Sequence, residues 1–145
     1  MKGDGIFLIS LVLIVILHNV ESKRMSFDEI KEALQPIKKI CIDRVKVDPK
    51  LIENANKGNF VPDRKLQCYF KCMMLMTKVM KNDKIVEQAL VQIAEIMLLE
   101  ELLDPVMKAI SNCRDTTLKP MEGCELAYEV TKCYYDYDPT LRFYP

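Results

Sequence analysis

Apolar residues recur along the chain at intervals of three and four, the spacing that places side chains on one face of an α-helix. Strict alternation of apolar and polar residues, which marks a half-buried strand, is nearly absent, and glycine occurs only four times. The pattern therefore predicts an all-α fold in which helices are joined by short polar connections.

Start and stop signals divide the chain into six expected helices. Ser26 opens the first with a capping box, and Pro36 should kink that helix because proline lacks a backbone N–H. The Asp-Pro pairs at 48–49 and 104–105 should begin the second and fifth, since Asp is a favoured N-cap and Pro is tolerated at the first position. The expected helices cover about residues 26–41, 48–58, 63–80, 85–96, 104–113 and 124–135.

The most apolar stretch lies near the N-terminus. Residues 6–17 form a largely apolar run behind Lys2, too short for a membrane-spanning helix of about 20 residues but suited to the core of a signal peptide. We expect residues 1–22 to be a signal peptide, with Val20 and Ser22 as the small residues before the cut. Residues 23–145 should then form a single secreted, extracellular domain. An uncleaved membrane anchor is the alternative.

The composition of residues 23–145 argues against several classes of function. They hold 20 basic and 19 acidic residues, so there is no basic excess to bind nucleic acid or an anionic membrane. The single histidine, His18, lies in the expected signal peptide, so histidine-dependent triads and zinc sites cannot be built from the remainder. We expect no enzyme activity, no metal and no cofactor. Any pH dependence would involve carboxylates, whose reference pKa values are about 3.3–4, so the behaviour of the protein should change little between pH 7 and 6.

Six cysteines remain, at positions 41, 68, 72, 113, 124 and 133. An even number in a short secreted chain predicts a disulfide framework, and six cysteines allow 15 complete pairings. Cys68 and Cys72 lie one helical turn apart, too far to bond each other without breaking the helix. Cys124 and Cys133 would lie about 13.5 Å apart along a helix. Removing the pairings that join either of these two pairs leaves ten.

The complete cysteine spacing resembles that of a known family. The pattern C-x26-C-x3-C-x40-C-x10-C-x8-C, together with the segment Asn59–Cys72 and the triplet at 113–115, is similar to the six-cysteine insect odorant-binding proteins, the pheromone and general odorant-binding family. The resemblance implies a six-helix, disulfide-linked domain around an internal hydrophobic cavity. It also implies the bonds Cys41–Cys72, Cys68–Cys124 and Cys113–Cys133.

The resemblance further implies a secreted carrier of small hydrophobic molecules, such as odorants, pheromones or fatty-acid-like compounds, that performs no chemistry on them. An olfactory receptor and a second copy of the chain are the other partners it suggests. A secreted helical interaction or signalling protein with a filled core is the alternative. A carboxylate-based hydrolase is a third reading, although no acidic pair is singled out by the sequence.

Methionines concentrate in the expected third helix, which is apolar on more than one face. Methionine is flexible and polarizable, so it suits a cavity that accepts several apolar shapes, although it also fills irregular cores. Matching helix by helix to the family implies ligand-binding roles for Leu34, Ile37, Phe70, Met74, Val79, Ile93, Ile96, Val106, Ile110, Ala127 and Val130. Thr77 and Tyr134 are the expected hydroxyl donors.

The tail at residues 134–145 is too apolar for a solvated chain end. In the family, tails of this length fold back as a wall or lid of the pocket. The resemblance implies that Leu141, Phe143 and Tyr144 insert there, beside the ligand contact Tyr134. A frayed tail, or one packed outside the pocket, is the alternative.

Overall fold

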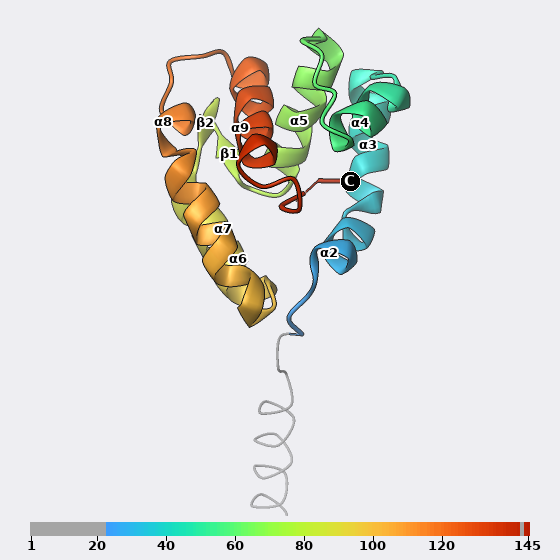
Figure 1. Cartoon of the computed structure of the whole chain (residues 1–145). Helices are drawn as coiled ribbons and strands as arrows, with labels where there is room; N and C mark the ends of the chain where they lie inside the picture. Colours follow the sequence, from blue (N-terminus) through green and yellow to red (C-terminus); the bar gives the residue numbers. More distant parts are fainter. Residues whose placement is uncertain (1–22, 143) are drawn as a thin grey trace, which may run out of the picture.

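The computed structural model of the chain describes residues 23–142, 144 and 145. The expected signal peptide and the expected ligand contact Phe143 lie outside these residues. With the labels of Figure 1, the helices are α2 (Phe27–Ala33), α3 (Gln35–Val45), α4 (Pro49–Asn56), α5 (Arg64–Met76), α6 (Glu87–Met97), α7 (Glu100–Asn112), α8 (Arg114–Thr117) and α9 (Gly123–Tyr137). A short hairpin pairs β1 (Met80–Lys81) with β2 (Lys84–Ile85).

The all-α prediction is confirmed, with eight helices in the described residues where six were expected. The first expected helix is two helices. The capping box at Ser26 opens α2, and the helix is interrupted at Leu34, between α2 and α3. Pro36 lies in the first turn of α3, where its missing N–H costs no helical hydrogen bond, so the kink becomes a boundary. The other additional helix, α8, is a short segment directly after α7.

The third expected helix ends earlier than the sequence suggests, at Met76 rather than near Met80. Met80 instead pairs with Ile85 in the antiparallel hairpin. Asn82 and Asp83 form its turn with φ values of 51° and 58°, and Asn and Asp are among the residues that tolerate this left-handed region. The polar break expected at 81–84 is therefore a hairpin turn.

The fifth expected helix begins at Glu100, four residues before Asp104, and Pro105 lies inside it. Leu102 and Leu103 pack against the core, and we attribute the early start to this apolar contact, which outweighs the single backbone hydrogen bond that a proline removes. Asp104 is not a cap but forms an ion pair of 2.7 Å with Lys108 one turn later.

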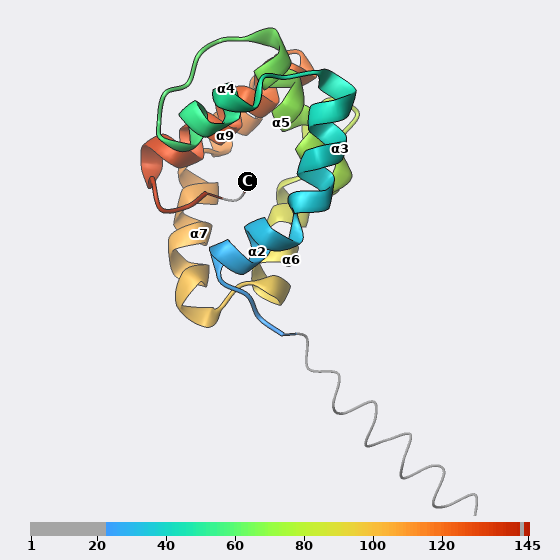
Figure 2. The same ribbon diagram turned by 90° about the vertical axis from the view of Figure 1, so that its right-hand side faces the viewer.

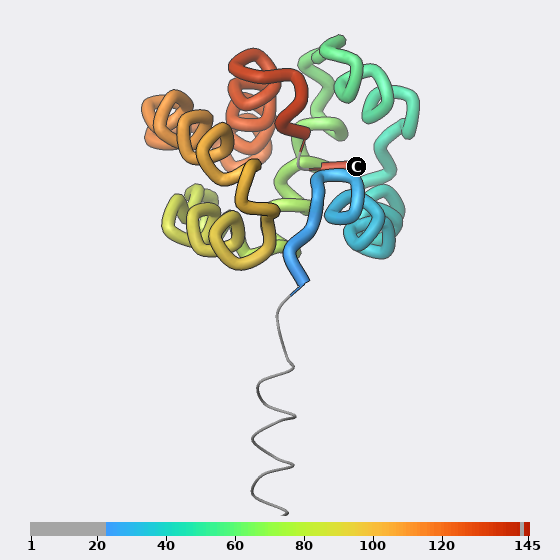
Figure 3. Tube along the Cα trace, turned by 60° about the horizontal axis from the view of Figure 1, so that its bottom comes forward, coloured from blue at the N-terminus to red at the C-terminus, as the bar shows by residue number. Residues whose placement is uncertain are grey.

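The helices are arranged in a ring. In Figure 1, α6 and α7 form one arm and α2 and α3 the other, and α5 and α9 pack extensively against each other between them. The arms meet where the backbone N–H of Met25 donates to the carbonyl of Met97 at 2.6 Å. Figures 2 and 3 show the same ring from two further directions, and in Figure 2 the C-terminus lies within it.

Three disulfides fix the ring. The structure contains the bonds Cys41–Cys72 from α3 to α5, Cys68–Cys124 from α5 to α9, and Cys113–Cys133 from the end of α7 to α9. These are the pairs that the family resemblance implies, and they form one of the ten sets that helix geometry leaves open. Two of the three bonds start from α5 and run to different neighbours.

The start of α9 is held by a charged cap. The Glu122 carboxylate accepts the backbone N–H of Cys124 at 3.0 Å and that of Glu125 at 3.3 Å. The Arg64 guanidinium on α5 donates to the same carboxylate at 2.7 Å, and this hydrogen bond lowers the pKa of Glu122. One side chain thus caps α9 and links it to α5.

Replacing Glu122 by alanine should destabilise the fold at pH 7 by about 0.5–2 kcal/mol, because backbone donors of α9 lose their acceptor. The folded pKa of Glu122 is lowered, so its contribution is present above the unfolded pKa of about 4.5 and is lost as the pH falls through the folded value. Urea unfolding of the wild type and Glu122→Ala should therefore converge between pH 7 and pH 3. Glu125→Ala is the control, since its carboxylate is not the cap. A stability difference for Glu122→Ala that persists at pH 3 would contradict this role.

Candidate ligand-binding cavity

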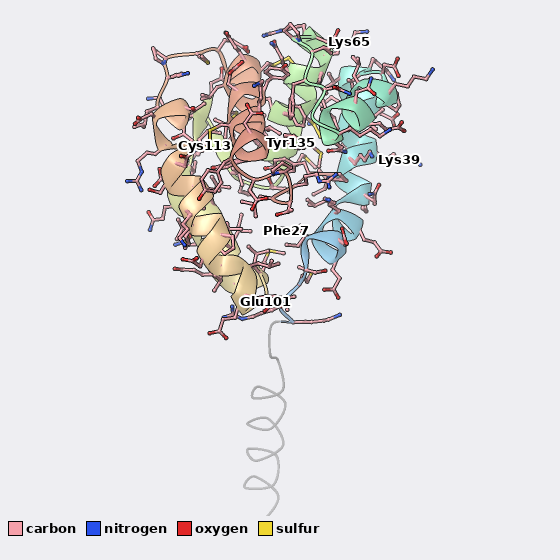
Figure 4. The ribbon with its side chains drawn as sticks, viewed as in Figure 1. Phe27, Lys39, Lys65, Glu101, Cys113 and Tyr135 are labelled. Atoms are coloured by element: carbon pink, nitrogen blue, oxygen red, sulfur yellow. A yellow bond between two sulfur atoms is a disulfide. The ribbon has the colours of Figure 1, made fainter. Side chains whose placement is uncertain are left out.

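An apolar cavity of about 340 Å³ lies inside the ring of helices. This volume falls at the low end of the range of about 300–1,000 Å³ for small-molecule sites. Its wall comes from α2, α4, α5, α6, α7 and α9, from the connections around α5, and from the tail. In Figure 4 the labelled Lys39 and Lys65 lie at the outer edge, whereas the wall residue Tyr135 lies toward the middle.

α6 supplies a continuous apolar strip of this wall. The strip has the spacing i, i+3, i+4 and i+7, which places its members on one helix face: Leu90, Ile93, Ala94 and Met97. α7 adds Val106 and Ile110, four residues apart and both buried. All of these side chains are hydrocarbon or thioether, so this part of the wall offers a ligand no hydrogen bond.

α5 contributes Phe70 and Met74, which lie one turn apart. Phe70 lies between the two disulfide-bonded cysteines of α5, and Met74 lies just beyond them. After the helix ends, Thr77 and Val79 continue the wall. The Thr77 hydroxyl donates to the carbonyl of Met73 at 2.9 Å and so completes the last turn of α5. The methionine-rich segment therefore presents both apolar surface and one hydroxyl group to the cavity.

Phe60 and Tyr135 line the cavity where α9 meets the loop before α5. The ring of Phe60 lies 5.6 Å from that of Tyr135 and 5.8 Å from that of Tyr128, both in edge-on arrangements that favour aromatic pairs. Gly58 has a φ of 90°, and a Cβ there would lie 2.8 Å from the Tyr135 ring. Glycine thus allows the loop to approach the ring.

After α9, the tail turns into the ring of helices. Asp138 forms the turn by accepting the backbone N–H of Thr140 at 2.9 Å and its hydroxyl at 2.7 Å, and these bonds lower the pKa of Asp138. Leu141 then lies buried in the cavity wall. The main-chain oxygen of Pro145 accepts a hydrogen bond of 2.7 Å from the Tyr69 hydroxyl in the interior. The expected alternative of a frayed tail does not describe these residues.

Polar groups are few in the wall. Apart from Tyr135 and from Thr131, whose hydroxyl donates to the carbonyl of Ala127, they lie in two places. At the inner one, the hydroxyl oxygens of Thr77 and Tyr144 are 3.4 Å apart, and burial raises the pKa of Tyr144 to about 12 and also raises that of neighbouring Tyr134. At the outer one, the Arg142 guanidinium donates to the carbonyl of Asn56 at 3.0 Å, exposed to solvent. The inner group is neutral at physiological pH and the outer one is cationic.

Most residues expected to bind ligand lie in the cavity wall. They are Leu34, Phe70, Met74, Val79, Ile93, Val106, Ile110, Val130, Tyr134, Leu141 and Tyr144. The expected hydroxyl donor Thr77 lies there too. Their contact with a ligand stays a prediction.

Three expected contacts lie elsewhere. Ile96 is 59% exposed, because α6 turns its side chain away from the strip that contains Ile93. Ile37 is half-buried against the core but lies beyond the break at Leu34, outside the wall. Ala127 is fully buried, yet its single methyl group does not form part of the wall. The expectation that these three side chains face the cavity is corrected accordingly.

Other wall residues could not be predicted from the sequence. Leu90, Ala94 and Met97 share the helical strip of Ile93, but a second strip through Ile96 has equally regular spacing, so periodicity cannot choose between them. Phe60 lies in a loop, where no periodic pattern reports the direction of a side chain.

Charge is concentrated outside the cavity. Within the described part of the chain, Arg142 is the one ionic wall residue, and the carboxylates whose pKa values are shifted, Glu29, Glu122 and Asp138, lie elsewhere. Over residues 23–142 and 144–145, no group of three or more His, Cys, Asp or Glu side chains is suited to a metal ion. In the same residues no helix is both long and apolar enough to cross a membrane.

Comparison with known proteins finds relatives in the fruit fly. General odorant-binding protein 19a of Drosophila melanogaster is 26% identical over 97 residues, and general odorant-binding protein 69a of the same species is 28% identical over 96 residues. Each match covers 65% of this chain, and they cover 66% and 61% of the respective relatives. The chain thus spans just under two thirds of the length of these relatives.

Solved structures of other insect proteins share the fold. Odorant binding protein 5 of Apis mellifera superposes with a TM-score of 0.76 over 85% of this chain and 100% of that one, at 24% identity. Odorant binding protein 4 of Chrysopa pallens gives a TM-score of 0.74 over 83% and 99% of the two chains, at 28% identity. Both scores reflect the same arrangement of helices.

A family model covers most of the chain. The model of the PBP/GOBP family matches residues 23–137, from the first described residue to the end of α9. This range contains all six cysteines and the helices that enclose the cavity. The chain therefore belongs to the PBP/GOBP family.

Proposed function

We propose that the chain is a secreted carrier that binds small hydrophobic molecules in the cavity inside its ring of helices. The observation that supports this proposal most is the wall of that cavity, which is mostly apolar. Burial of a CH₂ group contributes about 0.8 kcal/mol, so ten buried methylenes contribute about 8 kcal/mol before the costs of association. Micromolar affinity then requires no strong polar contact.

Odorants or pheromones are the ligand class that we propose. The fruit-fly relatives and the Chrysopa pallens protein carry the name odorant-binding protein, and the family match supports a related role here. The disulfides and the expected signal peptide support secretion, since such bonds persist in oxidising compartments. A receptor partner and a dimer stay predictions.

A fluorescent-probe assay tests this function. The full chain, produced in a secreting host so that its disulfides form, is titrated with N-phenyl-1-naphthylamine and then with long-chain alcohols, aldehydes and esters. We expect one probe molecule per chain and displacement at micromolar concentrations. A protein with a filled core would bind no stoichiometric probe, and that result would refute the proposal.

Substitution of Ala94 by leucine should weaken probe binding at least threefold and leave stability unchanged or higher. Ala94 is buried in the cavity wall, so the added carbons enter open space and exclude ligand. Ala109→Leu is the matched comparison: Ala109 is fully buried outside the wall, where overpacking should cost about 1–3 kcal/mol. Urea unfolding and probe titration measure both effects. Equal destabilisation by the two variants, with unchanged binding in Ala94→Leu, would show that the space is not available to a ligand.

We also propose that the tail acts as a lid, since Leu141 and Tyr144 contribute to the wall. Truncation after Asp138 should weaken a good ligand about tenfold or more, because burial of one leucine alone is worth about 1.5–3 kcal/mol. Leu141→Ala should have a smaller effect in the same direction. Leu118→Ala is the matched control, since Leu118 is 73% exposed. Affinity that survives the truncation unchanged would exclude the lid role.

A further inference from the structure

One inner corner of the mostly apolar cavity wall carries hydroxyl groups. Thr77 follows α5 and Tyr144 lies in the tail, 67 residues later, and their hydroxyl oxygens are 3.4 Å apart. Tyr134 from α9 also lines the cavity, and Tyr144 is close enough to raise its pKa. Three separate parts of the chain therefore bring hydroxyl-bearing residues to one place.

The single proton of the Thr77 hydroxyl is already used. Its oxygen lies 2.9 Å from the carbonyl of Met73 and 3.3 Å from that of Met74, so it donates into the last turn of α5. A hydroxyl has one proton and two lone pairs, so toward Tyr144 the Thr77 oxygen can only accept. Tyr144 is therefore the donor in that contact.

The hydrogen bond that the Tyr144 hydroxyl donates to Thr77 is long and therefore weak. A relaxed O–H···O bond spans about 2.7–2.8 Å, and the 3.4 Å separation from Thr77 is much longer. By contrast, the Tyr69 hydroxyl nearby donates to the main-chain oxygen of Pro145 at 2.7 Å. Among the hydroxyls of Thr77, Tyr69 and Tyr144, and within the described residues, the Tyr144 hydroxyl is the one that donates to no backbone oxygen. A partly buried donor in this situation gains from a ligand that can accept its proton.

We propose that Tyr144 and Thr77 form the polar recognition site of the cavity and select ligands that carry one neutral oxygen, as in an aldehyde, ketone, ester or alcohol, on an apolar chain. The ligand oxygen accepts the Tyr144 proton. An alcohol can also donate its own proton to the remaining lone pair of the Thr77 oxygen. This inference rests on the proposed carrier function and narrows the class of ligand.

A carboxylate does not suit the same corner. The ionisable groups that affect its tyrosines are the other tyrosines and the carboxylate of Glu87, which is already paired with the Arg114 guanidinium at 2.6 Å, so none of these groups offers an anion a positive charge. Arg142 is two residues from Tyr144, but its guanidinium is directed to the carbonyl of Asn56 at the exposed edge. An anion in the corner would lose its hydration without gaining a counter-ion, which is strongly unfavourable.

The test compares four ten-carbon ligands, decane, decanal, decan-1-ol and decanoate, as competitors of N-phenyl-1-naphthylamine at pH 7. The full chain is compared with Tyr144→Phe, which removes only the hydroxyl. We expect Tyr144→Phe to weaken decanal and decan-1-ol about fivefold and decane less than twofold, since one hydrogen bond is lost. In the wild type, decanoate should bind more weakly than decan-1-ol.

Two further variants sharpen the comparison. Thr77→Val keeps the shape of the side chain but removes the acceptor, so it should weaken decan-1-ol more than decanal. Tyr128→Phe is the control, because Tyr128 is a buried tyrosine of α9 that does not line the cavity, and no ligand should respond to it. Urea unfolding establishes that each variant is folded.

Two results would overturn the proposal. An equal effect of Tyr144→Phe on all four ligands would mean that the Tyr144 side chain only packs against the ligand and forms no hydrogen bond with it. Tightest binding of decanoate, with that advantage lost in Arg142→Ala, would mean that the polar end of the ligand lies at the exposed edge. Either result leaves the carrier function standing, because ligands still displace the probe, whereas a chain that binds no probe refutes that function itself.

Discussion

Two disulfide bonds that leave α5 one helical turn apart are the constraint on which the rest of the structure depends. Cys68 and Cys72 cannot bond each other within a helix, so each is joined to a different neighbour, α9 and α3. The third bond ties α7 to α9. An apolar cavity of about 340 Å³ costs about 8 kcal/mol at about 24 cal/mol per Å³, and three disulfides at about 2–4 kcal/mol each can offset that amount. A covalently closed ring can therefore keep its centre open.

The tail forms part of the wall of the cavity that the disulfide-linked helices surround. The turn at Asp138 directs it into the ring, Leu141 adds apolar wall, and the hydrogen bond from Tyr69 to Pro145 fixes its end. The same segment carries Tyr144 to Thr77. One stretch of chain thus lines the cavity and supplies the donor that, in our proposal, distinguishes oxygenated ligands from hydrocarbons.

Local signals in the sequence were enough for most of the fold. The capping box at Ser26 and the helical spacing of apolar residues act within a few residues, so they can be read without a structure. Local signals failed where distant contacts decided the outcome. The Asp-Pro pair at 104–105 has the form of a helix start, but Leu102 and Leu103 pack on the core and extend α7 toward its N-terminus.

The cavity wall was predictable only in part for the same reason. α6 is apolar on more than one side, so Ile93 and Ile96 look equivalent until the neighbouring helices are placed. Phe60 lies in a loop, and the approach of Tyr144 to Thr77 joins residues 67 positions apart, which no periodic pattern can report. The cysteine spacing was more informative because it carries the resemblance to the family, and that resemblance implies which distant cysteines are bonded.

A crystal structure of the full protein with decanal would decide whether the ring encloses a ligand. A hollow centre predicts the aldehyde chain inside the cavity, against the strip of α6 and the Phe70–Met74 face of α5, with its oxygen within hydrogen-bond distance of the Tyr144 hydroxyl. Decanal bound only to the outer surface, with the interior filled by the protein's own side chains, would contradict this picture.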